Sequence, residues 1–136
     1  MNYIPRIVDK EINDKLKIMG AILIRGPKWC GKTTSAKQIA NSILEMQNPD
    51  LQENYIELAN TKPSLLLEGE KPRLIDEWQL EPKLWNAVRY AIDNVGSPNQ
   101  YILTGLATPN DDKFIHSGVG RFAFVTMKPM TLYETG

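Results

Sequence analysis

Residues 26–33 read Gly26-Pro27-Lys28-Trp29-Cys30-Gly31-Lys32-Thr33 and match the pattern G-x-x-x-x-G-K-[ST], the P-loop or Walker A motif. The apolar run Ala21-Ile22-Leu23-Ile24 stands directly before the motif and predicts a buried strand. The run after the motif predicts a helix, because its apolar residues form one stripe: Ala36, Ile39, Ala40, Ile43 and Leu44. Strand, glycine-rich loop and helix are the context that this motif requires. The alternative is a plain glycine turn between a core strand and a core helix.

The spacing of the motif suits a polyphosphate, which is multiply anionic and needs many donors at short range. Gly26 and Gly31 lack Cβ atoms, so the backbone is free to curl and turn successive N–H groups inward. The N-terminus of the following helix adds unpaired N–H groups and its positive dipole end. Lys32 would place its ammonium on the β- and γ-phosphates, and the hydroxyl of Thr33 would bind Mg²⁺. We therefore predict that residues 26–34 bind nucleotide: Gly26, Pro27, Lys28, Trp29, Cys30, Gly31, Lys32, Thr33 and Thr34.

A second acidic motif follows another apolar run, at Arg73-Leu74-Ile75-Asp76-Glu77. Two carboxylates after a buried strand form a Walker B arrangement when a P-loop is also present. Asp76 would hold Mg²⁺ directly or through water, and Glu77 would orient and polarise an attacking water. The alternative is an exposed Asp-Glu pair, which is common on protein surfaces.

The rest of the chain gives further elements. We predict an extended arm over 1–6, a helix over 7–19, a strand at Tyr55–Leu58 and a helical turn at 65–67. A helix opens at Glu81-Pro82 and closes at Gly96, followed by strands at 101–105 and 122–127. Asn48-Pro49 is expected to end the helix that follows the P-loop.

Strands that alternate with helices predict an α/β fold with a parallel sheet covered on both faces. Ligands of such sheets bind at the carboxyl ends of the strands, which places the P-loop, Asp76 and Thr104 at one edge. The hydroxyl of Thr104 would sense the γ-phosphate or hold the attacking water, or Thr104 is an ordinary strand threonine. Arg121 would neutralise charge on a neighbouring subunit's nucleotide, or it is a solvated or carboxylate-paired arginine.

Composition points to one ordinary globular domain. The chain has 136 residues, 42% of them hydrophobic, and a net charge of +0. A neutral chain gives no electrostatic case for nucleic acid as the main partner. The single cysteine, Cys30, excludes an internal disulfide and suits a reducing cytoplasm. No apolar run reaches the length of a membrane span.

Several other side chains have a structural interpretation. His116 is the only histidine and is expected in a loop, without a metal-binding role. Trp78 and Trp85 are expected in the core, and Trp29 and Cys30 are expected to pack within their loop.

Five segments occur in order: Gly-Pro-Lys-Trp-Cys-Gly-Lys-Thr at 26–33, Arg-Leu-Ile-Asp-Glu-Trp-Gln at 73–79, Tyr-Ile-Leu-Thr-Gly at 101–105, His-Ser-Gly-Val-Gly-Arg at 116–121 and Met-Lys-Pro-Met-Thr-Leu-Tyr-Glu-Thr-Gly at 127–136. Together they resemble the prokaryotic AAA-type ATPases whose core is followed by a C-terminal domain of unknown function. The resemblance runs from about residue 3 to the end of the chain. The Pro-Met-Thr-Leu-Tyr-Glu segment is its most specific part.

This resemblance implies a three-layer P-loop NTPase core of the AAA+ type, with five mostly parallel strands and helices on both faces. The Thr104 strand would lie between the Walker A and Walker B strands. ATP and Mg²⁺ would be the ligands. Lys32, Glu77, Thr104 at the sensor position and Arg121 at the arginine-finger position would serve catalysis, and Thr33 and Asp76 would bind the metal. If Arg121 acts on the nucleotide of a neighbouring subunit, the protein would form a homo-oligomer.

The chain departs from the family in two places. Leu106 follows Thr-Gly where members usually carry a small polar residue, and members continue past a segment like 131–136. We expect residues 1–136 to be an ATPase core without the C-terminal lid and second domain, with weak or no turnover alone. The leading hypothesis is ATP hydrolysis coupled to that domain. The alternatives are a small P-loop kinase and a nucleotide-gated interaction module without turnover.

Overall fold

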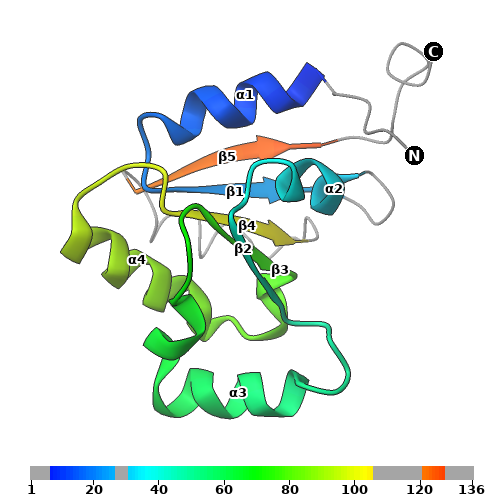
Figure 1. Ribbon diagram of the computed structural model, residues 1–136, viewed down its shortest axis with the longest axis vertical. Coiled ribbons are helices and arrows are strands. Elements are labelled where there is room, and N and C mark those ends of the chain that lie inside the picture. The colour runs from blue at the N-terminus through cyan, green and yellow to red at the C-terminus, as the bar shows by residue number, and fades with distance from the viewer. Residues whose placement is uncertain (1–6, 27–30, 106–120, 128–136) are drawn as a thin grey trace.

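The computed structural model describes residues 7–26, 31–105 and 121–127. Five strands and six helical segments follow one another in this part of the chain (Figure 1). In order they are α1 (Ile7–Leu16), β1 (Ala21–Arg25), α2 (Lys32–Lys37), β2 (Ser42–Glu45), α3 (Gln52–Thr61), η1 (Pro63–Leu67), β3 (Arg73–Asp76), η2 (Trp78–Leu80), α4 (Lys83–Val95), β4 (Tyr101–Gly105) and β5 (Phe122–Thr126).

The five strands form one parallel sheet in the order β2-β3-β4-β1-β5. The predicted α/β fold is therefore confirmed, and β4 lies between β1 and β3 as the family resemblance implied. Because neighbouring strands run in the same direction, their carboxyl ends meet at one edge of the sheet. Asp76 lies opposite Thr104 in the register, and Arg25 lies opposite Gly105.

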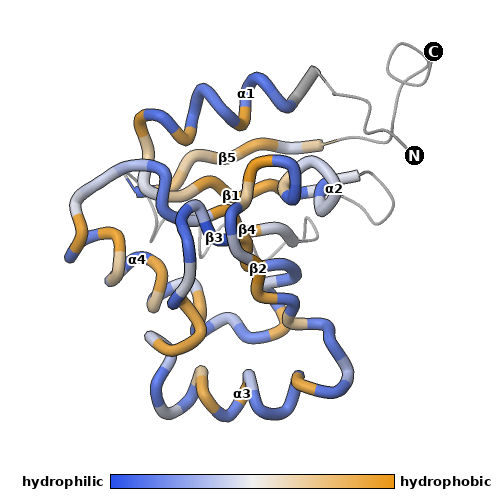
Figure 2. The backbone as a smooth tube through the Cα atoms, viewed as in Figure 1, coloured by the Kyte–Doolittle hydropathy of each residue, from blue (hydrophilic) through white to orange (hydrophobic). Residues whose placement is uncertain are grey.

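Apolar side chains cover both faces of the sheet and form two clusters. Alternate residues of β1 divide between them, because successive side chains of a strand point to opposite faces. Leu23 joins the cluster under α3, η1 and α4, whereas Ile22 and Ile24 join the cluster under α1 and α2. Figure 1 shows α1 and α2 on one side of the sheet and α3 and α4 on the other, and Figure 2 shows the apolar strands between them. This is the predicted three-layer arrangement.

The prediction of one long helix after the P-loop is wrong. Helix α2 ends at Lys37, and Ile43 and Leu44 belong to strand β2. The apolar spacing fitted a helix because Ile39 and Ala40, in the turn between α2 and β2, continue the stripe from Ala36 to the apolar residues of the strand. Burial separates the two, since Leu44 and Met46 are buried whereas Ile43 is partly exposed, which is the two-residue period of a strand.

The strand expected at Tyr55–Leu58 is also wrong, because these residues lie within helix α3. Tyr55, Leu58 and Ala59 all pack on the core cluster, and their spacing of three and four residues is that of a helix. Asn48-Pro49 therefore does not end a helix but begins the turn into α3. Within this turn, the N–H of Asp50 donates a hydrogen bond to Oδ1 of Asn48 at 3.0 Å.

The other elements predicted within the described residues are confirmed, with small shifts at their ends, and the extended arm expected over 1–6 lies outside the described residues. Helix α1 ends at Leu16 rather than at residue 19, and residues 65–67 lie in the helical turn η1. Helix α4 ends where expected, because Gly96 adopts φ 72 and donates its N–H to the carbonyl of Ile92 at 2.9 Å. None of the helices in these described ranges has both the length and the apolar character that a bilayer crossing requires.

Trp85 is the centre of the larger core cluster, as its predicted core position required. It is 0% exposed, stacks on Phe122 with ring centroids 4.0 Å apart, and lies 5.1 Å from the ring of Trp78. We expect Trp85→Ala to lower the free energy of unfolding by about 3–5 kcal/mol, because it leaves a large cavity between α4 and the sheet. Urea denaturation measures this loss. Tyr90→Ala is the control, since Tyr90 is an aromatic residue of the same helix that is 70% exposed; a similar loss there would contradict the account.

Candidate functional site

The carboxyl edge of the sheet brings the two sequence motifs together. Strand β1 leads into Gly26, whose N–H donates to the carbonyl of Gly105 at 3.2 Å. Helix α2 begins at Lys32, directly after Gly31 with φ 89, a conformation that favours glycine. The predictions for Pro27, Lys28, Trp29 and Cys30 lie outside the described residues.

Lys32 is the first charged group of the site. Its side chain is 5% exposed, and its Nζ lies 3.7 Å from Oε1 of Glu77, which is 21% exposed. A buried ammonium requires an anionic partner, and in this structure the carboxylate of Glu77 provides it. The arrangement places a cation where the P-loop meets the end of β3.

Asp76 is the second charged group and is 1% exposed. Its Oδ1 accepts hydrogen bonds from the hydroxyl of Thr33 at 2.8 Å and from the hydroxyl of Thr104. Its Oδ2 accepts from Nε2 of Gln47 at 2.6 Å. These donors come from α2, β4 and the residues after β2, so the buried carboxylate is satisfied from three directions.

Glu77 adopts an unusual backbone conformation directly after β3. Its φ is 61 and its ψ is 50, in the left-handed region that residues other than glycine seldom enter. Its N–H donates to the hydroxyl of Thr104 at 3.2 Å, and its Oε2 accepts from Nε2 of Gln79. Backbone strain of this kind concentrates at functional sites, where neighbouring contacts hold it.

Thr104 connects the two acidic residues. Its hydroxyl donates to Asp76 and accepts from the N–H of Glu77, and the residue is 0% exposed. The hydroxyl is therefore committed to the end of β3 in this structure. Thr104 lies within strand β4, and its predicted contact with a γ-phosphate stays a prediction.

Two further residues of this network, Gln47 and Gln79, were not predicted. Gln47 was missed because residues 36–44 were assigned to a helix, so nothing placed Gln47 at the end of a strand. Gln79 has a weak signal, since it stands two residues after Glu77 in the Asp-Glu-Trp-Gln segment. Thr34 lies in the first turn of α2 and is exposed, and its predicted contact with nucleotide stays a prediction.

The oxygen atoms at this edge suit a hard divalent cation. Thr33 and Asp76 offer a hydroxyl and a carboxylate whose oxygens lie 2.8 Å apart. Mg²⁺ prefers oxygen ligands and usually takes one or two from the protein, with phosphates and water completing its shell. The residues predicted for the metal therefore fit Mg²⁺ by their chemistry.

Arg121 lies at the other edge of the sheet. It precedes β5, whose first residue, Phe122, pairs with Ala21 at the start of β1. The phosphate loop follows the opposite end of β1, about five residues from Ala21. At ~3.3 Å per residue, roughly 17 Å of strand separates Arg121 from the start of that loop. Arg121 forms an ion pair with Asp93 at 2.8 Å, and this hydrogen bond raises the pKa of Arg121. It is thus carboxylate-paired, as one sequence interpretation held.

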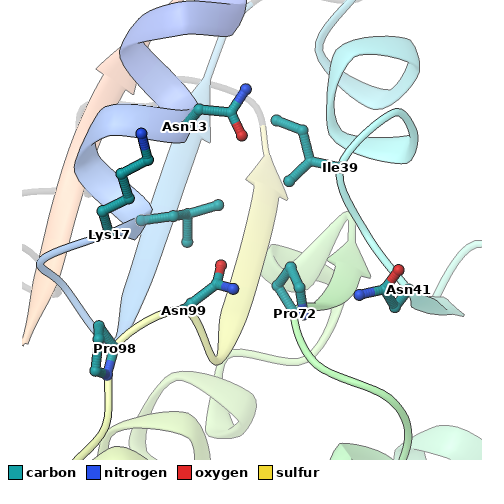
Figure 3. Close-up of a pocket in the computed structure, with 8 residues that line it drawn as sticks. Asn13, Lys17, Ile39, Asn41, Pro72, Pro98 and Asn99 are labelled. Carbon is teal, nitrogen blue, oxygen red and sulfur yellow. The ribbon is translucent and has the colours of Figure 1, made fainter.

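A surface pocket of about 380 Å³ lies at the same edge of the sheet as Arg121, where the amino ends of the strands meet (Figure 3). It is formed by the last turns of α1 and by the residues that precede β2, β3 and β4: Asn13, Leu16, Lys17, Ile39, Asn41, Pro72, Pro98 and Asn99. None of the predicted site residues lines it.

His116 and residues 128–136, which include most of the family-specific segment, lie outside the described residues.

Comparison with known proteins gives one family and a distant structural similarity. Residues 19–136 match the family described as AAA domain. No curated protein matches the chain. Solved structures similar to it include that of C. elegans PCH-2, with 20% sequence identity and a TM-score of 0.47. The alignment covers 90% of this chain but only 41% of that chain, so this chain spans less than half of its length.

We expect Thr104→Val to lower the free energy of unfolding by about 1–3 kcal/mol. The substitution keeps the shape of the side chain but takes a donor from buried Asp76 and an acceptor from the N–H of Glu77. Urea denaturation measures the loss. The control is Thr61→Val, because the hydroxyl of Thr61 donates to the carbonyl of Glu57 on an exposed helix surface. Equal effects of the two substitutions would show that the Thr104 hydroxyl does not stabilise the site.

Proposed function

Because the chain belongs to the AAA domain family, we propose that it binds ATP with Mg²⁺ and hydrolyses it to ADP and phosphate at the carboxyl edge of the sheet. The observation that supports this most is the meeting of Lys32, Thr33, Asp76 and Glu77 in one hydrogen-bonded and ion-paired group. These residues come from two segments that lie far apart in the sequence. Their chemistry is that of phosphate binding, metal binding and water activation.

The chemical group of each side chain suggests its role in hydrolysis. Lys32 would leave Glu77 and bind the β- and γ-phosphates, and Thr33 and Asp76 would hold Mg²⁺, which neutralises phosphate charge when bound. The oxygen of a water would then form a bond to the γ-phosphorus while one of its protons passes to the carboxylate of Glu77. The bond from the γ-phosphorus to the bridging oxygen would break, with its electron pair leaving on ADP.

Two other functions remain as alternatives. A small P-loop kinase would transfer the γ-phosphoryl group to an acceptor, and a nucleotide-gated module would bind ATP without turnover. The position of Glu77 favours water as the acceptor, since its carboxylate lies beside Lys32 and is only 21% exposed. By analogy with the family resemblance, hydrolysis would drive the motion of a domain that follows the core.

We expect Lys32→Ala to weaken ATP binding by about 10- to 100-fold, because an ammonium–phosphate contact contributes as much as a charged hydrogen bond. Titration with ATP, ADP and GTP, each with and without Mg²⁺, measures the dissociation constants. The control is Lys37→Ala, in the same helix, where Lys37 is 43% exposed and pairs with Glu45. If both variants bind ATP as tightly as the wild type, residues 26–33 are not the nucleotide site.

We expect Glu77→Gln to lower the rate of phosphate release by about 100-fold or more while ATP binding is retained, because a general base contributes a factor of this size. The rate is measured in single-turnover experiments with protein in excess of ATP, so that slow turnover is also detected. Glu81→Gln is the control, since Glu81 is a nearby glutamate whose Oε1 accepts the N–H of Lys83 at 3.3 Å. Phosphate that appears on an acceptor instead of free in solution would favour the kinase.

We also propose that Arg121 acts on the nucleotide of a neighbouring subunit in a homo-oligomer. The distance between the two edges of the sheet supports this, because it keeps Arg121 from its own phosphate loop. Arg121→Ala should then hydrolyse ATP slowly, and so should Lys32→Ala. A mixture of the two variants should exceed the sum of their separate rates, because Lys32→Ala still supplies Arg121. A mixture that gives only that sum would exclude an Arg121 that acts between subunits.

A further inference from the structure

Gln79 contacts the carboxylate of Glu77, which we assign to water activation, although no sequence motif assigns a role to Gln79. In the described part of the chain, Glu77 has two side-chain partners. Its Oε1 lies 3.7 Å from Nζ of Lys32, and its Oε2 accepts a hydrogen bond from Nε2 of Gln79. One partner comes from the phosphate-binding helix α2, and the other comes from η2, which follows β3.

The two partners differ in what nucleotide binding does to them. Under the proposed function Lys32 is drawn to the β- and γ-phosphates, so its contact with Glu77 weakens. The amide of Gln79 is neutral, so a phosphate attracts it less strongly than it attracts the ammonium of Lys32. We propose that Gln79 is a positioning residue, which holds the carboxylate of Glu77 in place for the attacking water after Lys32 has moved to the phosphates. This inference rests on the proposed hydrolysis.

The surroundings of Gln79 keep its amide in one place. Gln79 lies in the short turn η2 beside Trp78, which is 3% exposed and packs 5.1 Å from the ring of Trp85. On its other side stands Gly105, where an added Cβ would lie 2.6 Å from Oε1 of Gln79 and 2.9 Å from Nε1 of Trp78. Glycine at position 105 is therefore required for this close approach.

Gly105 also links Gln79 to the phosphate loop. Its carbonyl accepts the N–H of Gly26, the first residue of the P-loop motif, at 3.2 Å. The amide of Gln79 thus lies between the carboxylate of Glu77 and the backbone from which the loop begins. Among the residues that the structure describes, Oε1 of Gln79 is buried and meets no hydrogen-bond donor, which is an arrangement that stability alone disfavours. A site where a side chain is held at a cost in stability is expected to serve function.

Gln79→Met tests the inference, because methionine has a similar length and shape but cannot donate a hydrogen bond. We expect the single-turnover rate of phosphate release to fall by about 10- to 100-fold, the range that corresponds to one hydrogen bond to a charged group. The dissociation constant for MgATP should stay within about twofold of the wild-type value, because Lys32 and Thr33 are untouched. Gln79→Asn, which keeps the amide on a shorter side chain, should be less impaired than Gln79→Met.

The matched control is Gln100→Met, the same substitution at the opposite edge of the sheet, where Gln100 contacts the carbonyl of Pro98. It should leave both the rate and the dissociation constant unchanged. A second test combines Gln79→Met with Glu77→Gln. If Gln79 acts through Glu77, the double variant should be no slower than Glu77→Gln alone.

The outcomes separate this inference from the proposed function. A wild-type protein that binds MgATP but releases no phosphate would overturn the proposed hydrolysis and, with it, a role for Gln79. A wild-type protein that hydrolyses ATP while Gln79→Met does so at the same rate would overturn only the inference. A Gln79→Met variant that loses rate and MgATP affinity to the same extent would also overturn it, since Gln79 would then shape the binding site rather than position Glu77.

Discussion

The burial of the Asp76 carboxylate is the constraint on which the site depends. A charge that is 1% exposed is tolerated only when donors surround it. Those donors are Thr33, Thr104 and Gln47, which belong to three different parts of the fold. Satisfying one carboxylate therefore fixes the start of α2, the end of β4 and the residues after β2 relative to the end of β3.

The parallel sheet makes this convergence possible. Strands β1, β3 and β4 are neighbours and run in the same direction, so their last residues meet at one edge. The hydrogen bond from Gly26 to Gly105 continues this alignment into the phosphate loop. The amino edge has a different character, with the pocket of Figure 3 and the Arg121–Asp93 ion pair. The proposed phosphate site and the pocket therefore lie at opposite edges of the sheet.

The part of the fold that was predictable from sequence is the part in which pattern and turn signals agree. Residues 73–76 and 101–105 are short apolar runs that end in polar residues or glycine, and both are strands. Residues 42–45 and 55–58 were assigned wrongly, because a window of a few apolar residues fits both a strand and a helix. Burial by neighbouring elements decides between the two, and a single sequence does not contain that information.

The same distinction applies to the site. Lys32, Thr33, Asp76 and Glu77 stand in motifs whose spacing has a chemical reason, so the sequence alone identifies them as candidates. Gln47 reaches Asp76 only because β2 lies beside β3, a pairing that the misassigned helix had hidden. The left-handed conformation of Glu77 likewise follows from tertiary contacts, with its N–H bound to Thr104, rather than from any local preference of glutamate.

The most direct test of the account is a crystal structure of the protein with Mg²⁺ and a non-hydrolysable ATP analogue. The account predicts phosphates within the loop at residues 26–33, Nζ of Lys32 in contact with the β- and γ-phosphates, and Mg²⁺ bound near Thr33 and Asp76. An analogue bound elsewhere, for example in the pocket at the amino edge, with Lys32 still paired to Glu77, would contradict it.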